Sequence, residues 1–282
     1  MAVPAKAGRP QRIYPVELVL VIGRALAQLV RPPSHSRRAE AARRWARHAL
    51  WLTAVLSLAI VILMVGVDAF EIGLMPPRGT PSLWPVKIIT DFGKSAYVLW
   101  VLAGLLLVIV LIVPLLRGTS RAVMIGFGTR VQFLFLAVLV PIAIGEVLKG
   151  IIGRGRPFVG GAADPYNFSL FAWNEAYASF PSGHSITAAA LGFAVAAVWP
   201  RLTALMATYV FAILVSRLVL LAHHPSDVVA GALLGLVGAM AVRYWFAARR
   251  LAFTIRQDGT IDPLPGPSWD RVKRVARGGS AP

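Results

Sequence analysis

The chain has 282 residues, of which 57% are hydrophobic and only 15% are charged. A soluble domain of this length carries more charge, so the composition favours a membrane protein. Because there are no cysteines, a disulfide scaffold, a thiolate metal site and a cysteine nucleophile are all excluded. The formal net charge is +17. In a membrane protein such an excess of Lys and Arg marks cytoplasmic ends and contact with anionic lipids. We therefore expect membrane lipids as partners and no nucleic acid, while the oligomeric state is unknown from the sequence.

The first apolar run covers residues 14–30 and contains polar groups at helical spacing. Glu17, Arg24, Gln28 and Arg31 follow one another by 7, 4 and 3 residues, so they share one face of a helix. This pattern favours an amphipathic interfacial helix, lying at the membrane surface or docking on the rest of the protein, over a membrane span.

Six longer apolar segments follow, and most are close to the roughly 20 residues that a helix needs to cross the hydrocarbon. They cover residues 49–67, 97–116, 123–148, 185–199, 202–222 and 228–247. The fourth is short and ends at Pro200, so it spans only if it begins near Pro181. Gly231 and Gly235 in the sixth permit close packing of helices. The predicted fold is an all-α, polytopic bundle of six transmembrane helices.

The distribution of basic residues predicts the orientation of this bundle. Residues 1–48 hold ten Lys and Arg, and eight more lie from Arg243 onward. The positive-inside rule therefore puts both termini in the cytoplasm, and an even number of spans agrees. We expect a basic cytoplasmic extension with an interfacial helix at 1–48, the six-helix domain at 49–247, and a basic, loosely ordered cytoplasmic tail at 248–282.

This topology brings three polar segments to the non-cytoplasmic face. The third span exits at Lys149, the fourth enters near His184, the fifth exits near His223, and the sixth enters at Asp227. The segments read KGIIGRGRP at 149–157, PSGH at 181–184 and SRLVLLAHHPSD at 216–227. We expect their polar side chains to lie at one level of the bundle.

Three cations in these segments suit a phosphate group. Lys149 can act as a point charge, and Arg156 and Arg217 can make bidentate contacts. The PSGH segment precedes a helix, so its backbone N–H groups and the Ser182 hydroxyl can form an anion site, with Gly183 allowing close approach.

Two histidines add the chemistry of group transfer. Asp227 lies four residues after His223 and can fix its tautomer, leaving the other ring nitrogen as a nucleophile. His184 can protonate the leaving oxygen and then deprotonate a water molecule. These residues fit phosphoryl transfer through a phosphohistidine. Carboxylates are too few here for a two-metal mechanism, and we expect no metal and no cofactor.

The three segments resemble the motifs of the type 2 phosphatidic acid phosphatase superfamily, which read K-x6-RP, PSGH and SR-x5-H-x3-D. All three match in order and without departure. The resemblance implies a membrane lipid phosphatase with His223 as nucleophile, Asp227 as its orienting partner and His184 as general acid. It also implies a set of phosphate-binding residues, which are Lys149, Arg156, Ser182, Gly183 and Arg217.

Other polar residues near the motifs have simpler interpretations. Arg154 and His224 lie outside the pattern, and we interpret them as a loop charge and a lining or hydrogen-bonding residue. Glu146 is expected to be a buried partner of a cation. Asp68 and Glu71 suggest no function. The aromatic residues of the loop 158–180, among them Phe171 and Trp173, predict either an interfacial belt or a gate for lipid chains.

The expected activity is metal-independent hydrolysis of a lipid phosphate or diphosphate at the periplasmic or outer face of a bacterial plasma membrane. Family substrates include undecaprenyl diphosphate, phosphatidylglycerophosphate, phosphatidate and lipid A; the first and the glycerophospholipids are favoured as the commoner ones. A phosphotransferase using the same phosphohistidine is the main alternative. The membrane spans argue against a vanadate haloperoxidase, and an anion transporter would need polar residues through several spans.

Overall fold

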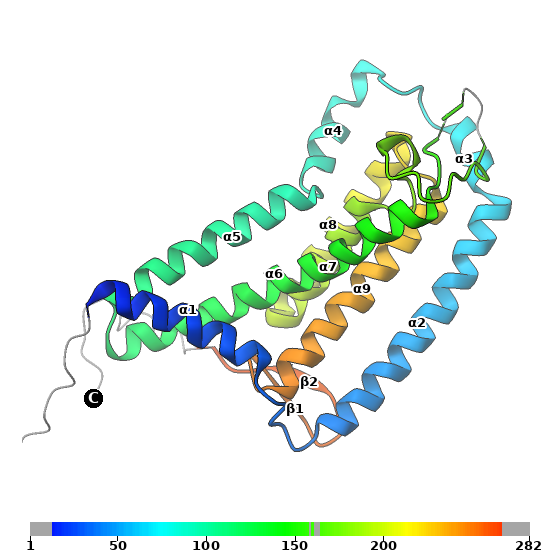
Figure 1. Ribbon diagram of the computed structural model, residues 1–282. Helices are drawn as coiled ribbons and strands as arrows, with labels where there is room; N and C mark the ends of the chain where they lie inside the picture. Colours follow the sequence, from blue (N-terminus) through cyan, green and yellow to red (C-terminus); the bar gives the residue numbers. More distant parts are fainter. Residues whose placement is uncertain (1–12, 158, 161–163, 267–282) are drawn as a thin grey trace, which may run out of the picture.

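The computed structural model describes residues 13–157, 159–160 and 164–266 of the chain. They form a bundle of helices with a small β-hairpin at one end (Figure 1). The helices are α1 (Tyr14–Val30), α2 (Arg38–Gly66), α3 (Asp68–Leu74), α4 (Trp84–Asp91), α5 (Ser95–Ile112), α6 (Gly118–Ile152), α7 (Gly183–Val198), α8 (Thr203–Val219) and α9 (Pro225–Ala248). Short 3-10 turns cover Pro81–Leu83, Val113–Leu115, Glu175–Tyr177 and Pro200–Leu202. The strands are β1 (Phe253–Ile255) and β2 (Ile261–Pro263).

Five stretches of helix in the described residues are long and apolar enough to cross a membrane. They are α2, the stretch Pro81–Leu115 with α4 and α5, α6, the stretch Pro200–Val219 with α8, and α9. These correspond to five of the six expected spans. The remaining one is α7, which is apolar but has only 16 residues. Its shortness agrees with the early stop at Pro200, so a count of six spans stays a prediction.

Helix α7 lies in the middle of the bundle, packed against α6, α8 and α9. Two glycines of α9 allow the closest of these contacts. A Cβ atom added at Gly231 would lie 2.4 Å from the carbonyl oxygen of Ser182, and one added at Gly235 would lie 2.4 Å from that of Ile186. The close helix packing expected from this pair is therefore confirmed, and it holds the start of α9 against the start of α7.

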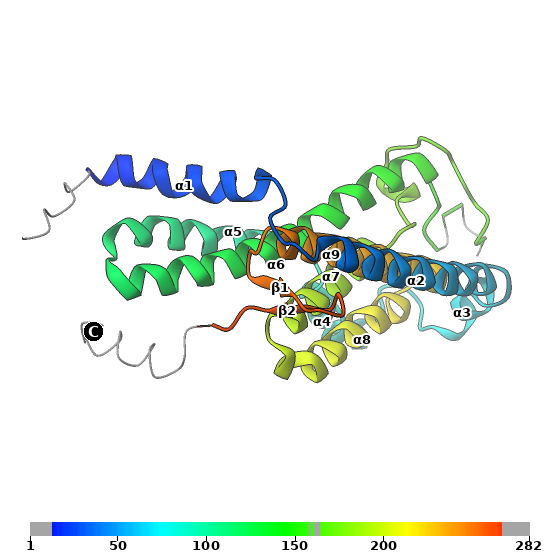
Figure 2. The ribbon, with the colours of Figure 1, turned by 90° about the horizontal axis from the view of Figure 1, so that it is seen from below.

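Helix α1 docks on the bundle beside α5 and the turn that follows α5 (Figure 2). Arg121 donates a 2.8 Å hydrogen bond to the Glu17 carboxylate, and the Tyr14 hydroxyl donates to the carbonyl of Leu111 at 3.0 Å. Docking is one of the two arrangements that the polar face of this helix suggested. A position in the membrane interface stays a prediction. Helix α2 begins at Arg38, so it crosses the boundary expected at residue 48.

The prediction of a loosely ordered C-terminal tail is wrong for the first part of that tail. Residues 253–263 form an antiparallel hairpin. Phe253 is fully buried and packs edge-on against Phe133, with ring centroids 4.7 Å apart. The turn contains Gly259 at a φ of +79°, which a glycine adopts without strain. The Gly, Pro and charge content suggested that this segment could not offset the entropy lost on ordering. Burial of the apolar strand β1 supplies the stabilisation that offsets that loss. The rest of the expected tail, residues 267–282, lies outside the described residues.

Candidate active site

A cavity of about 330 Å³ lies at the end of the bundle opposite the hairpin. Six of the eight predicted site residues line it. Its lining consists of Lys94, Ser95, Ala96, Glu146, Lys149, Arg156, Glu175, Gly183, His184, Arg217 and His223. The other two predicted residues, Ser182 and Asp227, are completely buried beside it. The fold thus brings together residues from three motifs that lie up to 78 positions apart in the sequence.

The three predicted cations reach the cavity from different elements. Lys149 comes from the last turn of α6, Arg156 from the loop after α6, and Arg217 from the last turn of α8. Arg217 donates a 2.7 Å hydrogen bond to the hydroxyl of Thr90 on α4, while its Nε has no partner among the described residues. Lys149 donates to the Glu146 carboxylate at 2.6 Å, so Glu146 is a cation partner as expected, although its side chain is 58% exposed rather than buried.

The first turn of α7 supplies donors that face the same cations. Ser182 precedes the helix, and its backbone N–H donates to the carbonyl of Asp227 at 3.0 Å. The Ser182 hydroxyl and His184 Nε2 are buried without a hydrogen-bond partner in the described part of the chain. A Cβ atom on Gly183 would lie 2.9 Å from Lys149 Nζ, so glycine lets the lysine approach this closely and a larger residue would shift its ammonium group. These groups can satisfy the oxygens of a phosphate.

His223 is oriented by a backbone carbonyl rather than directly by Asp227. Its Nδ1 lies 2.9 Å from the carbonyl oxygen of Ser179 and 3.9 Å from the nearer carboxylate oxygen of Asp227. A proton on Nδ1 is donated to that carbonyl, which leaves the lone pair on Nε2. The direct hydrogen bond expected between His223 and Asp227 is not formed.

Asp227 instead positions His223 indirectly, by hydrogen bonds to Ser179 and to the start of α9. The Ser179 hydroxyl donates to one Asp227 carboxylate oxygen at 2.6 Å, and the backbone N–H of His224 donates to the same oxygen at 2.9 Å. The second bond caps α9, which turns the carboxylate toward the helix end and away from the imidazole. Asp227 therefore fixes the segment that holds His223.

The electrostatic surroundings keep His223 neutral. Its ring is buried, and the cationic Arg217 and Arg156 lie nearby. Burial, followed by repulsion from these two arginines, holds the pKa of His223 well below the usual 6.5. A neutral imidazole with a free Nε2 is the form that can act as a nucleophile.

Arg154 lies at the centre of a buried network behind the cavity, which sequence reasoning missed. It is fully buried and donates to Asp227 at 2.6 Å, to Asp68 at 2.8 Å and to the Ser226 hydroxyl at 2.6 Å. Its Nε and Nη2 also donate to the carbonyl of Pro165. Asp68 in turn accepts from the backbone N–H of Ser226 at 3.0 Å. The interpretation of Arg154 as a loop charge is wrong, because its two carboxylate partners lie 86 and 73 positions away in the sequence.

Three further residues were not identified from the sequence: Lys94, which lines the cavity, and Thr90 and Ser179, which hold residues that line it. Thr90 holds Arg217, and Ser179 holds His223 and Asp227, as described above. Lys94 lines the cavity as a fourth cation and pairs with Asp91 at 2.8 Å. Lys94 lies just before the second predicted span, so the alternation of spans puts it on the same side of the membrane as Lys149. That position could have identified Lys94 as a candidate site residue.

The remaining expectations concern neighbours of the motifs. His224 is fully buried at the start of α9, as expected for a lining or hydrogen-bonding residue. Phe171 and Trp173 are both 64% exposed, and Trp173 covers Gly150 of α6. A belt and a gate both remain predictions for this loop. In the described part of the chain, no group of three or more His, Asp or Glu side chains is arranged to hold a metal ion.

Comparison with known proteins places this cavity in a family. The family model described as the PAP2 superfamily matches residues 130–251, a segment that contains all eight predicted site residues. This segment, which is less than half of the chain, matches the PAP2 superfamily. The resemblance to type 2 phosphatidic acid phosphatases, inferred from the three motifs, is therefore confirmed. The first 129 residues, with α1 to α5, lie outside the match to the PAP2 model.

Three curated relatives extend the comparison. A lipid A 1-phosphatase of Rhizobium johnstonii is 29% identical over 224 residues, which cover 78% of this chain and 86% of the relative. A lipid A 1-phosphatase of Rhizobium etli is 29% identical over 190 residues, or 67% of this chain and 78% of the relative. The bacitracin transport permease protein BcrC of Bacillus licheniformis is 29% identical over 135 residues, or 48% and 61%. No solved structure gives a significant match.

Proposed function

We propose that this protein is a membrane phosphatase that removes a phosphate group from a lipid. The observation that carries the proposal is the single cavity in which Lys149, Arg156 and Arg217 surround His184 and His223 at the end of a bundle of membrane-length helices. Buried donors at the start of α7 and on Arg217 have no partner among the described residues, which suits a ligand with several acceptor oxygens.

The relatives favour one substrate class among the family candidates. Two proteins named lipid A 1-phosphatase align over most of this chain, whereas the BcrC match covers about half of it. We therefore put a phosphorylated glycolipid of the lipid A type first. Undecaprenyl diphosphate, phosphatidylglycerophosphate and phosphatidate follow as alternatives. This order changes the preference that the sequence motifs alone suggested.

The proposed reaction begins with attack of His223 Nε2 on the phosphorus atom. As the new P–N bond forms, the P–O bond to the lipid breaks, and His184 gives its proton to the leaving oxygen. A phosphate dianion beside His184 favours the protonated imidazole that this step requires. The cations Lys149, Arg156 and Arg217 stabilise the negative charge on the three other phosphate oxygens.

Hydrolysis of the phosphohistidine completes the cycle. His184, now neutral, takes a proton from a water molecule while the water oxygen attacks the phosphorus atom. The P–N bond breaks, inorganic phosphate leaves, and His223 regains its neutral form with the proton on Nδ1. The Ser179 carbonyl accepts from Nδ1–H in the resting state at 2.9 Å and stabilises the positive charge of the intermediate.

The orientation proposed for the protein follows from the distribution of charge. The basic start of α2, from Arg38 to Arg47, and the basic stretch from Arg243 to Arg256 lie at the hairpin end, away from the catalytic cavity. By the positive-inside rule this end faces the cytoplasm, so the cavity opens on the periplasmic or outer side of the plasma membrane. Six spans, with α7 shielded from lipid by its neighbours, complete this topology.

The test is phosphate release from lipid A, undecaprenyl diphosphate, phosphatidylglycerophosphate and phosphatidate by the purified protein in detergent with EDTA. We expect release that is highest for lipid A, and its loss in His223→Ala but not in His48→Ala, an exposed histidine at the other end of the bundle. Release that persists in His223→Ala, or release that EDTA abolishes, would contradict the proposal.

A further inference from the structure

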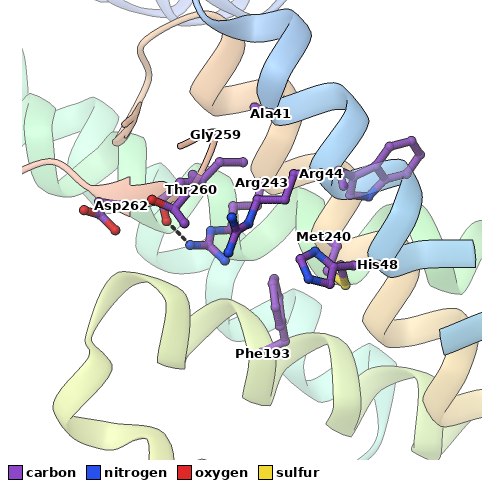
Figure 3. A pocket seen from close by; sticks show the side chains of 11 residues that line it. Ala41, Arg44, His48, Phe193, Met240, Arg243, Gly259, Thr260 and Asp262 are labelled. Carbon is purple, nitrogen blue, oxygen red and sulfur yellow. Dashed lines mark hydrogen bonds between the residues drawn. The ribbon is translucent and has the colours of Figure 1, made fainter. Parts of the chain in front are cut away.

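A second cavity, of about 350 Å³, lies beside the β-hairpin, at the opposite end of the bundle from the catalytic one. Figure 3 shows its lining residues from close by. It is enclosed by the start of α2, the middle of α7, the end of α9 and the β-hairpin. Its side chains combine bases with apolar and aromatic groups, and the residues used below are Arg44, Trp45, His48, Phe193, Met240 and Arg243. Nothing in the catalytic mechanism uses these residues.

Two donors in this cavity are buried without an acceptor. The Trp45 Nε1–H and the Arg243 Nε–H both lack a hydrogen-bond partner among the described residues. Buried polar groups in proteins are nearly always satisfied, and two orphans on one cavity wall point to a shared ligand. Because both groups can only donate, that ligand presents acceptor oxygens.

The charge of the cavity favours an anion. Arg44 donates to the backbone carbonyl of Asp258 at 3.4 Å and lies 3.9 Å from its carboxylate, with its own side chain 38% exposed. Arg243 donates to the backbone carbonyl of Ile261, and its charge is attracted by Asp262, which also lines the cavity. His48 adds a third basic side chain, and Figure 3 shows it beside the two arginines.

The carboxylates near the cavity are engaged within the hairpin. Asp262, which also lines the cavity, pairs with Arg256, and Asp258 accepts from the N–H and the hydroxyl of Thr260 at 2.9 and 2.6 Å. Three arginines, Arg44, Arg243 and Arg256, thus face two carboxylates, so the cavity and the hairpin beside it keep one net positive charge.

The depth of the cavity matches a lipid headgroup. Arg44 lies six residues after the start of α2, or about 9 Å along the helix axis, and the first apolar span follows from residue 49. This is the boundary between water and hydrocarbon, where basic cavities between helices bind phosphorylated headgroups. Phe193 and Met240 form the apolar wall on the bundle side.

We propose that this cavity binds a phosphate group at the membrane surface, held by Arg44, Arg243 and the Trp45 Nε1–H. The ligand is an anionic phospholipid headgroup or free phosphate, which share the acceptor oxygens and the negative charge. The bound phosphate group contacts both α2 and α9 and so stabilises their packing. It is distinct from the lipid phosphate that is hydrolysed at the other end of the bundle.

The test compares full-length variants in nanodiscs of phosphatidylcholine with and without phosphatidylglycerol, and in neutral detergent with phosphate or chloride at equal ionic strength. Thermal unfolding and native mass spectrometry measure stabilisation and retained ligand. Trp45→Phe removes one donor and keeps the ring that stacks on Tyr244, with centroids 6.1 Å apart. Arg44→Gln removes one charge, and Arg47→Gln is the matched control, because Arg47 is exposed on the same helix and does not line the cavity.

We expect wild type and Arg47→Gln to be stabilised alike, and Trp45→Phe and Arg44→Gln to retain the ligand about ten-fold less well, as for loss of one hydrogen bond to a charged group. Stabilisation by phosphatidylglycerol assigns the site to a lipid, and stabilisation by phosphate in detergent assigns it to the free anion. Equal stabilisation of all four proteins, or of none, would overturn the proposal. Because phosphatase activity resides at the other end, its retention shows that each variant is folded.

Discussion

Replacing Arg154 with methionine tests the buried network behind the catalytic cavity. The change removes the donors to Asp68 and Asp227, whose side chains are completely buried, and leaves two carboxylates without their shared cation. Removing one partner of a buried ion pair costs about 3–5 kcal/mol, because the remaining charge is desolvated and unpaired. We expect the free energy of unfolding to fall by about this amount.

A matched control lies two residues away in the same loop. Arg156 is partly exposed, and its nearest carboxylate, on Glu175, lies 3.8 Å away with 92% of its side chain exposed. Arg156→Met should therefore cost only about 1 kcal/mol or less of stability while it abolishes phosphate binding. The double variant Arg154→Met with Asp68→Leu removes two charges together, so it should lose less stability than the sum of its single variants.

Reversible unfolding by denaturant in mixed micelles measures these differences. At a temperature where Arg154→Met stays folded, we also expect kcat to fall more than KM rises, because Arg154 holds Asp227 and does not touch the cavity. Stability of Arg154→Met within about 1 kcal/mol of wild type, or additive losses in the double variant, would refute the argument that a buried charge network supports the site.

The other predictions concern pH and single contacts. Because the pKa of His223 is held well below 6.5, this proposed nucleophile stays neutral in mild acid, and the acidic limb of the kcat/KM profile should lie below pH 6.5; a limb at or above that value would contradict this. Ser179→Ala removes the hydroxyl bond to Asp227, so kcat should fall about ten-fold with KM unchanged in steady-state assays. A Cβ atom at Gly183 would displace the flexible Lys149 Nζ, so Gly183→Ala should reduce kcat/KM. Burial and the neighbouring Asp68 raise the pKa of Glu71 to about 7, above its usual 4.5. The folded protein then holds a proton that the unfolded chain has lost, so stability should fall as pH rises from 4.5 to 7, and Glu71→Gln should remove this dependence in unfolding experiments.

The motif residues and most helices could be predicted because they depend on local sequence. Apolar length indicates the spans, and the spacings around Lys149, Ser182 and His223 resemble the motifs of the type 2 phosphatidic acid phosphatases. The alternation of spans then indicates that these segments meet at one end of the bundle. Those inferences need no knowledge of side-chain packing.

The buried network could not be predicted because its members come from distant elements. Arg154 pairs with Asp68, which lies 86 positions away in the sequence. No local pattern around either residue indicates that the two are in contact. The contact between His223 and the Ser179 carbonyl is equally hidden, because every residue has a carbonyl and only the loop before α7 brings this one into place. In residues 253–263 the Asp258–Gly259 turn between short β-branched stretches is a hairpin signal, but the scattered charge and Pro content outweighed it.

The most direct test of the central claim is to search for the covalent intermediate. Labelled lipid phosphate is mixed with the protein, the reaction is quenched in base within one turnover, and the labelled peptide is identified by mass spectrometry. The account predicts acid-labile, base-stable phosphate on His223 that is absent from His223→Ala. Rapid release of phosphate with no labelled protein, or label on another residue, would contradict it.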